Sequence, residues 1–405
     1  MARKMKDSGI EWIGEIPEGW EVVPVKRLCT MQAGKNLTSE QIAPEGTYPV
    51  YGGNGIRGFF SDYNCDGQFL TVGRQGALCG NVHKINGKVW ATEHAVITTP
   101  SSYTILDFLY FLLIGMDLNQ YVSSTAAQPG LAVGTLLNLK TCYPCSTLEQ
   151  TQISNYLNAK CSEIDTMLSK TRASIEEYKK LKQSVITQAV TKTIYDDFGN
   201  PSKFRKLRSL CDVLSKGTTP KDIETQNDEF YCIRYLKSEN IVSNQLNLNP
   251  TFFITAETNN SLERSKLNSG DILFVIAGAS IGKVAITTAD FLPANTNQAV
   301  AFIRLSSSYQ YATKYIWYFL QSDVVKQLIA LSAVQSAQPN LSLEDLGAMR
   351  LPLPDQMGCL KITDYLDAKC AEIDGLIAKK EQLVKELESY KKSLIYEVVT
   401  GKREV

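Results

Sequence analysis

The sequence contains an internal repeat in which a stretch of 39 residues recurs without a gap. Residues 153–191 align with residues 362–400 at a constant offset of 209, and 16 of the 39 positions are identical. The strongest match sets "YLNAKCSEID" (156–165) against "YLDAKCAEID" (365–374). Two copies this similar are expected to form the same structure, so the repeat constrains the organisation of the whole chain.

Both copies are predicted to form long helices. Proline is absent from residues 148–191 and 355–405. A seven-residue step through each copy selects mostly apolar side chains, the pattern of a coiled-coil seam. These positions are Leu157, Ile164, Thr171, Tyr178 and Val185 in the first copy, and Leu366, Ile373, Lys380, Leu387 and Leu394 in the second. About 45 helical residues would extend for about 65–70 Å, and because such a helix is marginal in isolation, the two are expected to pair.

Shorter matches extend the repeat upstream of each helix. "AQPGL" (127–131) matches "AQPNL" (337–341), and "GALCGNV" (76–82) matches "GASIGKV" (278–284). Between these turns the two halves have diverged almost completely. The chain is therefore predicted to alternate a globular module with a long helix. The four parts are residues 1–147, 148–193, 194–354 and 355–405.

Each globular module is predicted to be α+β. "KVWATEHAVITT" and "DILFVIAG" are typical of strands, whereas "DFLYFLLIGM" and "TKYIWYFLQSDVVKQLIAL" are typical of helices. Strands come first in each module, and a helix precedes the return to the long helix. The predicted fold class is thus α+β, with two globular modules and two long antiparallel helices related by pseudo-two-fold internal symmetry.

Length and charge restrict the class of protein. A chain of 405 residues is expected to form two or more domains. No apolar run is long enough to span a bilayer, and the N-terminus has no signal-peptide core, so we expect a cytoplasmic protein with no membrane partner. The formal net charge is zero, which argues against coating nucleic acid by charge alone but leaves room for local basic faces.

The common catalytic and metal motifs are missing from the sequence. The ten cysteines are scattered, and Cys142 and Cys145 in "CYPC" are interpreted as two thiols beside a turn, since His83 and His94 are the only histidines. "NPTF" (249–252) resembles an adenine methyltransferase motif, but threonine replaces its second proline and no glycine-rich cofactor loop precedes it. We therefore predict no catalytic centre and no cofactor.

Two similar modules on a rigid spacer are suited to a partner that offers paired sites. Duplex DNA is such a partner, because dimeric readers place two recognition elements about 34 Å apart or a multiple of it. A scaffold with two peptide-binding heads would have the same organisation, so the residue pattern alone leaves both possibilities open.

The chain resembles the specificity (S) subunit of type I restriction–modification systems over essentially its whole length. The residues that carry the resemblance are "MKDSGIEWIGEIPEGWEV" (5–22), "YPVYGGNGIRGFF" (48–60), the AQP pair and the two "YLxAKCxEID" helices. The resemblance implies two target-recognition domains, each reading half of a bipartite double-stranded DNA site, with the helices paired antiparallel as a spacer. It also implies two adenine methyltransferase subunits and a translocating endonuclease subunit as partners.

One departure from the family pattern lies after the central helix. Many relatives repeat the "DSGIEWIGEIPEGW" element there, whereas this chain has "TKTIYDDFGNPSKFRKLRSL" (191–210). We therefore expect the second module to begin differently from the first.

Candidate DNA contacts in the first module lie in two glycine-rich segments. "YGGNGIRGFF" (51–60) offers Asn54 and Arg57, either as the tips of a loop against DNA or as part of a tight structural hairpin. "GRQGALCG" (73–80) offers Arg74 and Gln75, whose side chains can bridge guanine and adenine edges respectively. A purely structural turn remains the alternative for this second segment.

Candidate contacts in the second module come from basic and amide-rich segments, which suit phosphates and base edges but are also typical of solvated strand edges. They are Lys203, Arg205, Arg234, Lys237, Asn240, Lys283, Asn295 and Asn297. On the helices, three repeated charged positions are candidates for helix pairing or subunit docking. They are Lys160, Glu163 and Asp165, with Lys369, Glu372 and Asp374 in the second copy.

Three functions remain to be compared. The preferred one is a non-catalytic DNA-specificity subunit. The alternatives are the recognition part of a fused adenine methyltransferase or endonuclease system, and a coiled-coil scaffold that binds protein. Binding of S-adenosylmethionine by the isolated chain would favour the enzyme. Failure to bind duplex DNA alongside methyltransferase partners would favour the scaffold.

Overall fold

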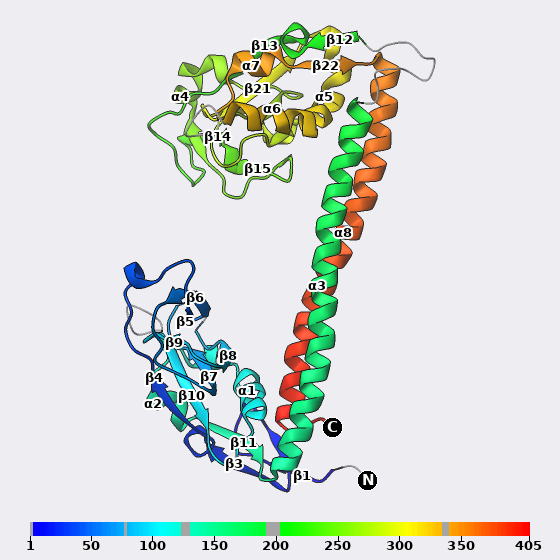
Figure 1. Ribbon diagram of the computed structural model, residues 1–405. Helices are drawn as coiled ribbons and strands as arrows, with labels where there is room; N and C mark the ends of the chain where they lie inside the picture. Colours follow the sequence, from blue (N-terminus) through cyan, green and yellow to red (C-terminus); the bar gives the residue numbers. More distant parts are fainter. Residues whose placement is uncertain (1–2, 77–78, 123–129, 192–202, 334–339) are drawn as a thin grey trace. The chain divides into compact units, whose positions relative to one another are not determined.

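The computed structural model describes residues 3–76, 79–122, 130–191, 203–333 and 340–405 (Figure 1). The chain divides into two compact units. Unit 1 comprises Met1–Arg172 and Gln382–Val405, and unit 2 comprises Ala173–Glu381. The AQP segments lie mostly outside the described residues. The four-part domain division remains a prediction.

Two long helices confirm the main expectation from the repeat. They are α3 (Thr147–Thr191) and α8 (Gln356–Val399), and each contributes one end to each unit. The described part of the chain contains no helix that is both long and apolar enough to cross a membrane.

The globular part of unit 1, outside the long helices, is built mainly from strands. We call the globular part of each unit its head. In the head of unit 1, the four-stranded sheet has the order β4-β10-β7-β8, a three-stranded sheet has the order β6-β5-β9, and β11 pairs with β3. The strands are β1 (Met5–Asp7), β2 (Glu15–Pro17), β3 (Trp20–Pro24), β4 (Cys29–Ala33), β5 (Tyr48–Gly52), β6 (Gly55–Phe60), β7 (Gln68–Gly73), β8 (Val82–Asn86), β9 (Trp90–Ala91), β10 (Ala95–Pro100) and β11 (Lys140–Pro144). The helices of this head are α1 (Leu106–Gly115) and α2 (Val133–Asn138).

The apolar helix α1 joins the sheet of unit 1 to the long helices. Its sequence "LDFLYFLLIG" is apolar around almost the whole circumference, as expected of a buried helix. One side packs on β7, β8 and β10. Phe108 and Leu112 belong to the same hydrophobic core as Leu157 of α3 and Ile395 of α8. Burial of this core holds the head of unit 1 against the helix pair.

The head of unit 2 has the same strand order although its sequence has diverged. Its sheets have the orders β13-β21-β18-β19 and β17-β14-β20, and β12 pairs with β22. The strands are β12 (Lys203–Lys206), β13 (Cys211–Lys216), β14 (Tyr231–Leu236), β15 (Ile241–Val242), β16 (Gln245–Leu246), β17 (Phe253–Thr255), β18 (Ile272–Val275), β19 (Val284–Ile286), β20 (Ala294–Thr296), β21 (Val300–Leu305) and β22 (Arg350–Leu353). The helices are α4 (Ala256–Ser261), α5 (Thr313–Leu320), α6 (Asp323–Ala333) and α7 (Leu343–Ala348).

One expected helix of unit 2 is interrupted. The segment "TKYIWYFLQSDVVKQLIAL" was predicted as a single helix, but α5 ends at Leu320 and α6 begins at Asp323. The break is stabilised by α3, because Gln183 Nε2 donates to the carbonyl of Gln321 at 2.7 Å and the amide of Asp323 donates to Thr187 Oγ1 at 3.0 Å. The backbone groups freed by the break are thus paired by side chains remote in sequence.

The predicted strand "KVWATEHAVITT" is also divided, into β9 and β10. Between them the carbonyl of Thr92 accepts a hydrogen bond from the amide of Ala95 at 2.9 Å, which forms a turn. This turn lets β9 pair with β5 while β10 continues in the larger sheet. The residues of the turn, Glu93 and His94, are therefore placed next to the loops of the head.

Candidate nucleic-acid interface

Three loops of unit 1 meet at one edge of the head. They are the β5–β6 turn around Asn54, the described part of the β7–β8 loop, and the turn that contains His94. Asn81 Nδ2 donates to Asn54 Oδ1 at 2.5 Å, and the amide of Arg74 donates to the carbonyl of His94 at 3.0 Å. We call residues 53–55, 74–76, 80–83 and 93–94 the loop cluster of unit 1. It unites three of the four candidate contacts predicted in this module: Asn54, Arg74 and Gln75.

Glycine is required for this close approach of the loops. A methyl group on Gly73 would overlap the carbonyl oxygen of Gly53, and one on Gly53 would lie 2.9 Å from the carbonyl oxygen of Gln75. The glycines of "YGGNGIRGFF" therefore have a structural role. The side chain of Asn54 at the tip is nevertheless exposed, so its contact with DNA stays a prediction.

Four buried polar atoms of the loop cluster have no hydrogen-bond partner in the described part of the chain. They are Arg74 Nε, His83 Nε2, Glu93 Oε2 and His94 Nδ1. Glu93 and His94 contact each other through their other atoms, since Glu93 Oε1 lies 3.1 Å from His94 Nε2. Buried polar atoms are normally paired, so a gathering of unpaired atoms suits a site that an incoming ligand completes. Burial lowers the pKa of His83, which favours a neutral ring with one donor and one acceptor.

The sequence did not single out His83, Glu93 and His94 as candidate contacts. One signal was available, because His83 and His94 are the only histidines of the chain. Arg57, the fourth candidate of this module, is not among the residues with unpaired atoms. It is exposed, and the stem of its side chain packs over Gly52.

Two predicted contacts of unit 2 are buried inside the head. Asn295 is fully buried, and its amide donates to Asn259 Oδ1 at 3.0 Å and to the carbonyl of Leu262 at 3.2 Å. Asn240 is 1% exposed and donates to the carbonyls of Asn247 and Pro250. Both side-chain amides therefore donate their hydrogen bonds within the fold.

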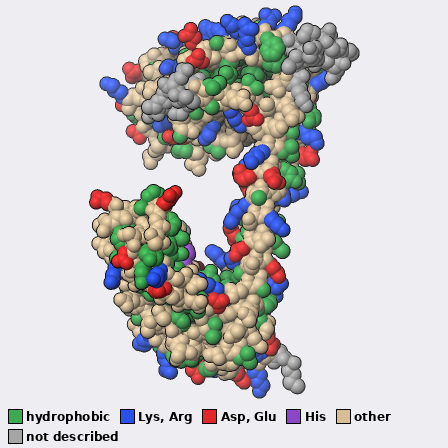
Figure 2. Space-filling model, in the orientation of Figure 1, with side chains coloured by type: hydrophobic (Ala, Val, Ile, Leu, Met, Phe, Trp, Pro, Cys, Tyr) green, Lys and Arg blue, Asp and Glu red, His purple; other side chains and the backbone are tan. Residues whose placement is uncertain are grey.

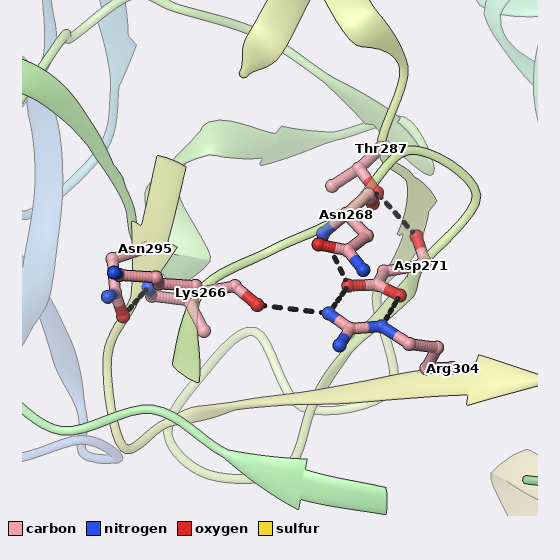
Figure 3. A network of polar contacts seen from close by, with 7 residues as sticks. Lys266, Asn268, Asp271, Thr287, Asn295 and Arg304 are labelled. Carbon is pink, nitrogen blue, oxygen red and sulfur yellow. Dashed lines mark hydrogen bonds and ion pairs between the residues drawn. The ribbon is translucent and has the colours of Figure 1, made fainter. Parts of the chain in front are cut away.

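A network of charged and polar groups lies near Asn295 (Figure 3). Arg304 donates to both carboxylate oxygens of Asp271, at 2.8 and 2.7 Å, and also to the carbonyl of Lys266 at 2.9 Å. The side chain of Asp271 is 1% exposed. Thr287 Oγ1 donates to the carbonyl of Asp271 at 3.0 Å. This network ties β21 to the segment that leads into β18, so its role is structural.

The other candidates of unit 2 are partly or fully accessible. Arg234 donates to the carbonyl of Asp290 at 2.6 Å, and Lys237 lies 3.6 Å from the ring centre of Phe252. Lys283 and Asn297 are half-buried. Lys203 and Arg205 belong to β12, whose side chains are all exposed. Lys203 and Arg205 therefore present their charges to solvent.

The repeated charged residues of the helices fall into two kinds of pair. Lys160 binds Glu163 at 2.9 Å and Lys369 binds Glu372 at 2.8 Å, each within one helix. In unit 1, Asp165 of α3 binds Lys391 of α8 at 2.6 Å. In unit 2, Asp374 of α8 binds Lys182 of α3 at 2.6 Å. The repeated aspartates thus join the two helices, whereas the repeated lysines and glutamates lie on the exposed surface.

The comparison with protein families shows what this fold is. A family model described as "Type I restriction modification DNA specificity domain" matches residues 17–177 and again residues 200–385. The chain belongs to this family. The first match contains most of the first head and much of α3. The second match contains most of the second head and much of α8.

Individual relatives agree with this family. The specificity subunit of the type I restriction enzyme EcoprrI from Escherichia coli is 41% identical over 161 residues, which cover 39% of this chain and 38% of that protein. The MjaVIII specificity subunit from Methanocaldococcus jannaschii is 23% identical over 416 residues, which cover 96% of this chain and 93% of that protein. The stronger match therefore spans well under half of its relative.

A solved structure shows the same fold. It comes from work on complex assembly and conformational transition of the type I R-M system, and it matches with a TM-score of 0.72 at 14% identity. The match covers 96% of this chain and 99% of the other.

Proposed function

We propose that this chain is the non-catalytic DNA-specificity subunit of a type I restriction–modification complex, in which each head reads one half of a bipartite DNA site. The observation that carries the proposal is the double match to the specificity domain, once for each head. The shared strand order of two heads with divergent sequences supports it, because equal folds with different surfaces suit two different half-sites.

The loop cluster of unit 1 is the proposed base-reading site of the first head. Arg and Gln suit guanine and adenine edges, and the unpaired polar atoms of the cluster would gain partners from the bases. In the second head, Arg234, Lys237, Lys283 and Asn297 are proposed contacts, with Lys203 and Arg205 as phosphate contacts.

The two long helices are proposed to form an antiparallel coiled coil that sets the spacing between the half-sites. The ion pairs between the helices support the antiparallel arrangement, because higher residue numbers in α3 pair with lower residue numbers in α8. The pairs are Asp165–Lys391 and Arg172–Glu388 in unit 1, and Lys182–Asp374 in unit 2. The repeat supports a pseudo-two-fold arrangement with parts at residues 1–147, 148–193, 194–354 and 355–405.

The proposed partners are double-stranded DNA, two adenine methyltransferase subunits and one endonuclease subunit that translocates DNA. The repeated surface pairs Lys160–Glu163 and Lys369–Glu372 would offer the same docking surface twice. We expect the complex to act in the cytoplasm.

Reconstitution tests the proposed function. The chain is purified with its methyltransferase subunits, and transfer of labelled methyl groups to duplex DNA is measured with and without the chain. We expect site-specific transfer that requires the chain, while the chain alone neither transfers methyl groups nor binds S-adenosylmethionine. Cofactor binding by the chain alone would support an enzyme, and a complex that does not bind DNA would support a protein scaffold.

A further inference from the structure

Unit 1 contains a basic cleft between its head and the helix pair. The cleft has a volume of about 1360 Å³. The head contributes residues of β8 and α1, among them Lys84, Tyr110 and Phe111, and the opposite wall comes from α3 and α8. Figure 2 shows lysine and arginine side chains, with acidic side chains among them, along the surface of these helices. We call this space the unit 1 cleft.

Positive charge predominates in the unit 1 cleft. Two of its charged lining residues are acidic, Asp165 and Glu388, and six are basic. The basic residues are Lys84, Lys170, Arg172, Lys385, Lys391 and Lys392. Hydroxyl and amide side chains lie among them, namely Asn158, Ser162, Thr166, Ser169 and Ser389. This mixture is the one that proteins use to bind nucleic-acid phosphates.

The six basic residues of the cleft divide into three that form ion pairs and three that form none with the described residues. Lys84, Arg172 and Lys391 form ion pairs with Asp107, Glu388 and Asp165. Lys170, Lys385 and Lys392 are exposed, and within the described residues none of these three has an ion-pair partner. Their charges remain available to an anion in the cleft.

Helix pairing does not account for these charges, as the repeat shows. At the offset of 209, the seven charged helix positions of the unit 1 cleft correspond to seven positions in unit 2. Unit 1 has five basic and two acidic residues there, whereas unit 2 has three of each. The replacements are Lys385 by Glu176, Lys392 by Gln183, Arg172 by Glu381 and, in the opposite sense, Glu388 by Lys179. Since unit 2 pairs its helices without the excess, the excess in unit 1 has another use.

The unit 1 cleft is continuous with the loop cluster. Val82 and His83 belong to the loop cluster and also line the cleft, together with Tyr51 of the adjoining strand. DNA whose bases reached the loop cluster would therefore bring its backbone towards the cleft. An acidic protein would also be attracted by the charge, but this continuity favours nucleic acid.

We infer that the unit 1 cleft binds the sugar–phosphate backbone of the recognised duplex through Lys170, Lys385 and Lys392. The inference rests on the proposed function and adds a role for the helices that is independent of sequence. Phosphate contacts position the duplex without selecting bases. The helix ends of unit 1 would thus add an electrostatic contribution to binding of the first half-site. The helix ends of unit 2 would add a smaller one at the second half-site.

Salt-dependent binding tests this inference. The triple variant K170Q/K385Q/K392Q is compared with K4Q/K26Q/K361Q, which removes the same charge from exposed lysines that neither line the unit 1 cleft nor occupy the corresponding positions of unit 2. Binding of a labelled duplex to the chain with its methyltransferase subunits is measured over a series of salt concentrations. A duplex with the methylated site and one of unrelated sequence are both used.

We expect the cleft variant to weaken binding of both duplexes by about tenfold or more and to reduce the salt slope by about 2–3, because each lost phosphate contact removes about 0.9 from that slope. The control variant should keep the wild-type slope, and the methylated sequence should not change. An unchanged salt slope in the cleft variant, or an equal reduction of the slope in the control, would overturn this inference but not the proposed function. Failure of the wild-type complex to bind any duplex would instead refute the proposed function.

Discussion

At the scale of single residues, the ion pair between Asp271 and Arg304 has the strongest effect predicted for unit 2. The carboxylate is 1% exposed, whereas the guanidinium is 27% exposed. Removing one partner from a buried pair is costly mainly because the other charge stays buried. The two partners are therefore not equivalent.

We predict that Arg304→Ala destabilises unit 2 by about 3 kcal/mol, whereas Asp271→Asn costs less. In the first variant a buried carboxylate loses its counterion. In the second the remaining guanidinium can be hydrated. Urea denaturation, with hydrogen exchange at β18 and β21 as the local probe, measures both losses. A larger loss of stability for Asp271→Asn than for Arg304→Ala would contradict this prediction.

The cysteines provide a second prediction at this scale. Burial raises the pKa of both Cys29 and Cys142 to about 12. At pH 8 only about one thiol in ten thousand is then ionised, and the thiolate is the reactive form. We predict that iodoacetamide labels the exposed Cys232 in the native chain and leaves Cys29 and Cys142 unlabelled until the chain unfolds. Mass spectrometry measures the labelling, and equal rates at Cys142 and Cys232 would refute the burial.

At the scale of elements, the loop cluster depends on the approach of β5 to β7. Gly73→Ala is predicted to push these strands apart, because the added methyl group meets the carbonyl of Gly53. The expected result is a destabilisation of about 1–3 kcal/mol and loss of recognition at one half-site only. Gly134→Ala in α2 is the matched control, since no atom lies within 4 Å of its added methyl group.

Methylation mapping of both glycine variants measures this effect. The control should keep both half-sites, while Gly73→Ala should relax or lose the half read by unit 1. Loss of both halves in Gly73→Ala, or of either half in Gly134→Ala, would show that the cluster is not an independent reader.

The elements also show how far sequence reasoning reaches. The long helices follow from periodicity and the absence of proline, and both were confirmed. The break between α5 and α6 could not be predicted, because Gln183 and Thr187 of α3 stabilise it across a long sequence separation. The burial of Asn240 and Asn295, which were predicted as base contacts, could not be predicted for the same reason. Composition does not reveal that their partners lie inside the head.

At the scale of the whole molecule, the repeat predicts that two heads share one fold, and their strand orders agree. The proposal that the helix pair sets the spacing between the half-sites can be tested by inserting four residues after Arg172 in α3. The insertion adds about 6 Å of helix. We predict a longer spacer between unchanged half-sites, read from the methylated motif. Altered half-sites with an unchanged spacer would refute the proposal that the helices set the spacing.

The central claim is that this chain selects a split DNA site for adenine methylation. A long-read map of N6-methyladenine in the source genome, made with and without the gene, tests it most directly. We predict a two-part motif, interrupted by an unspecified spacer, that is methylated only when the gene is present. A map that does not change on deletion, or the loss of an uninterrupted motif, would contradict it.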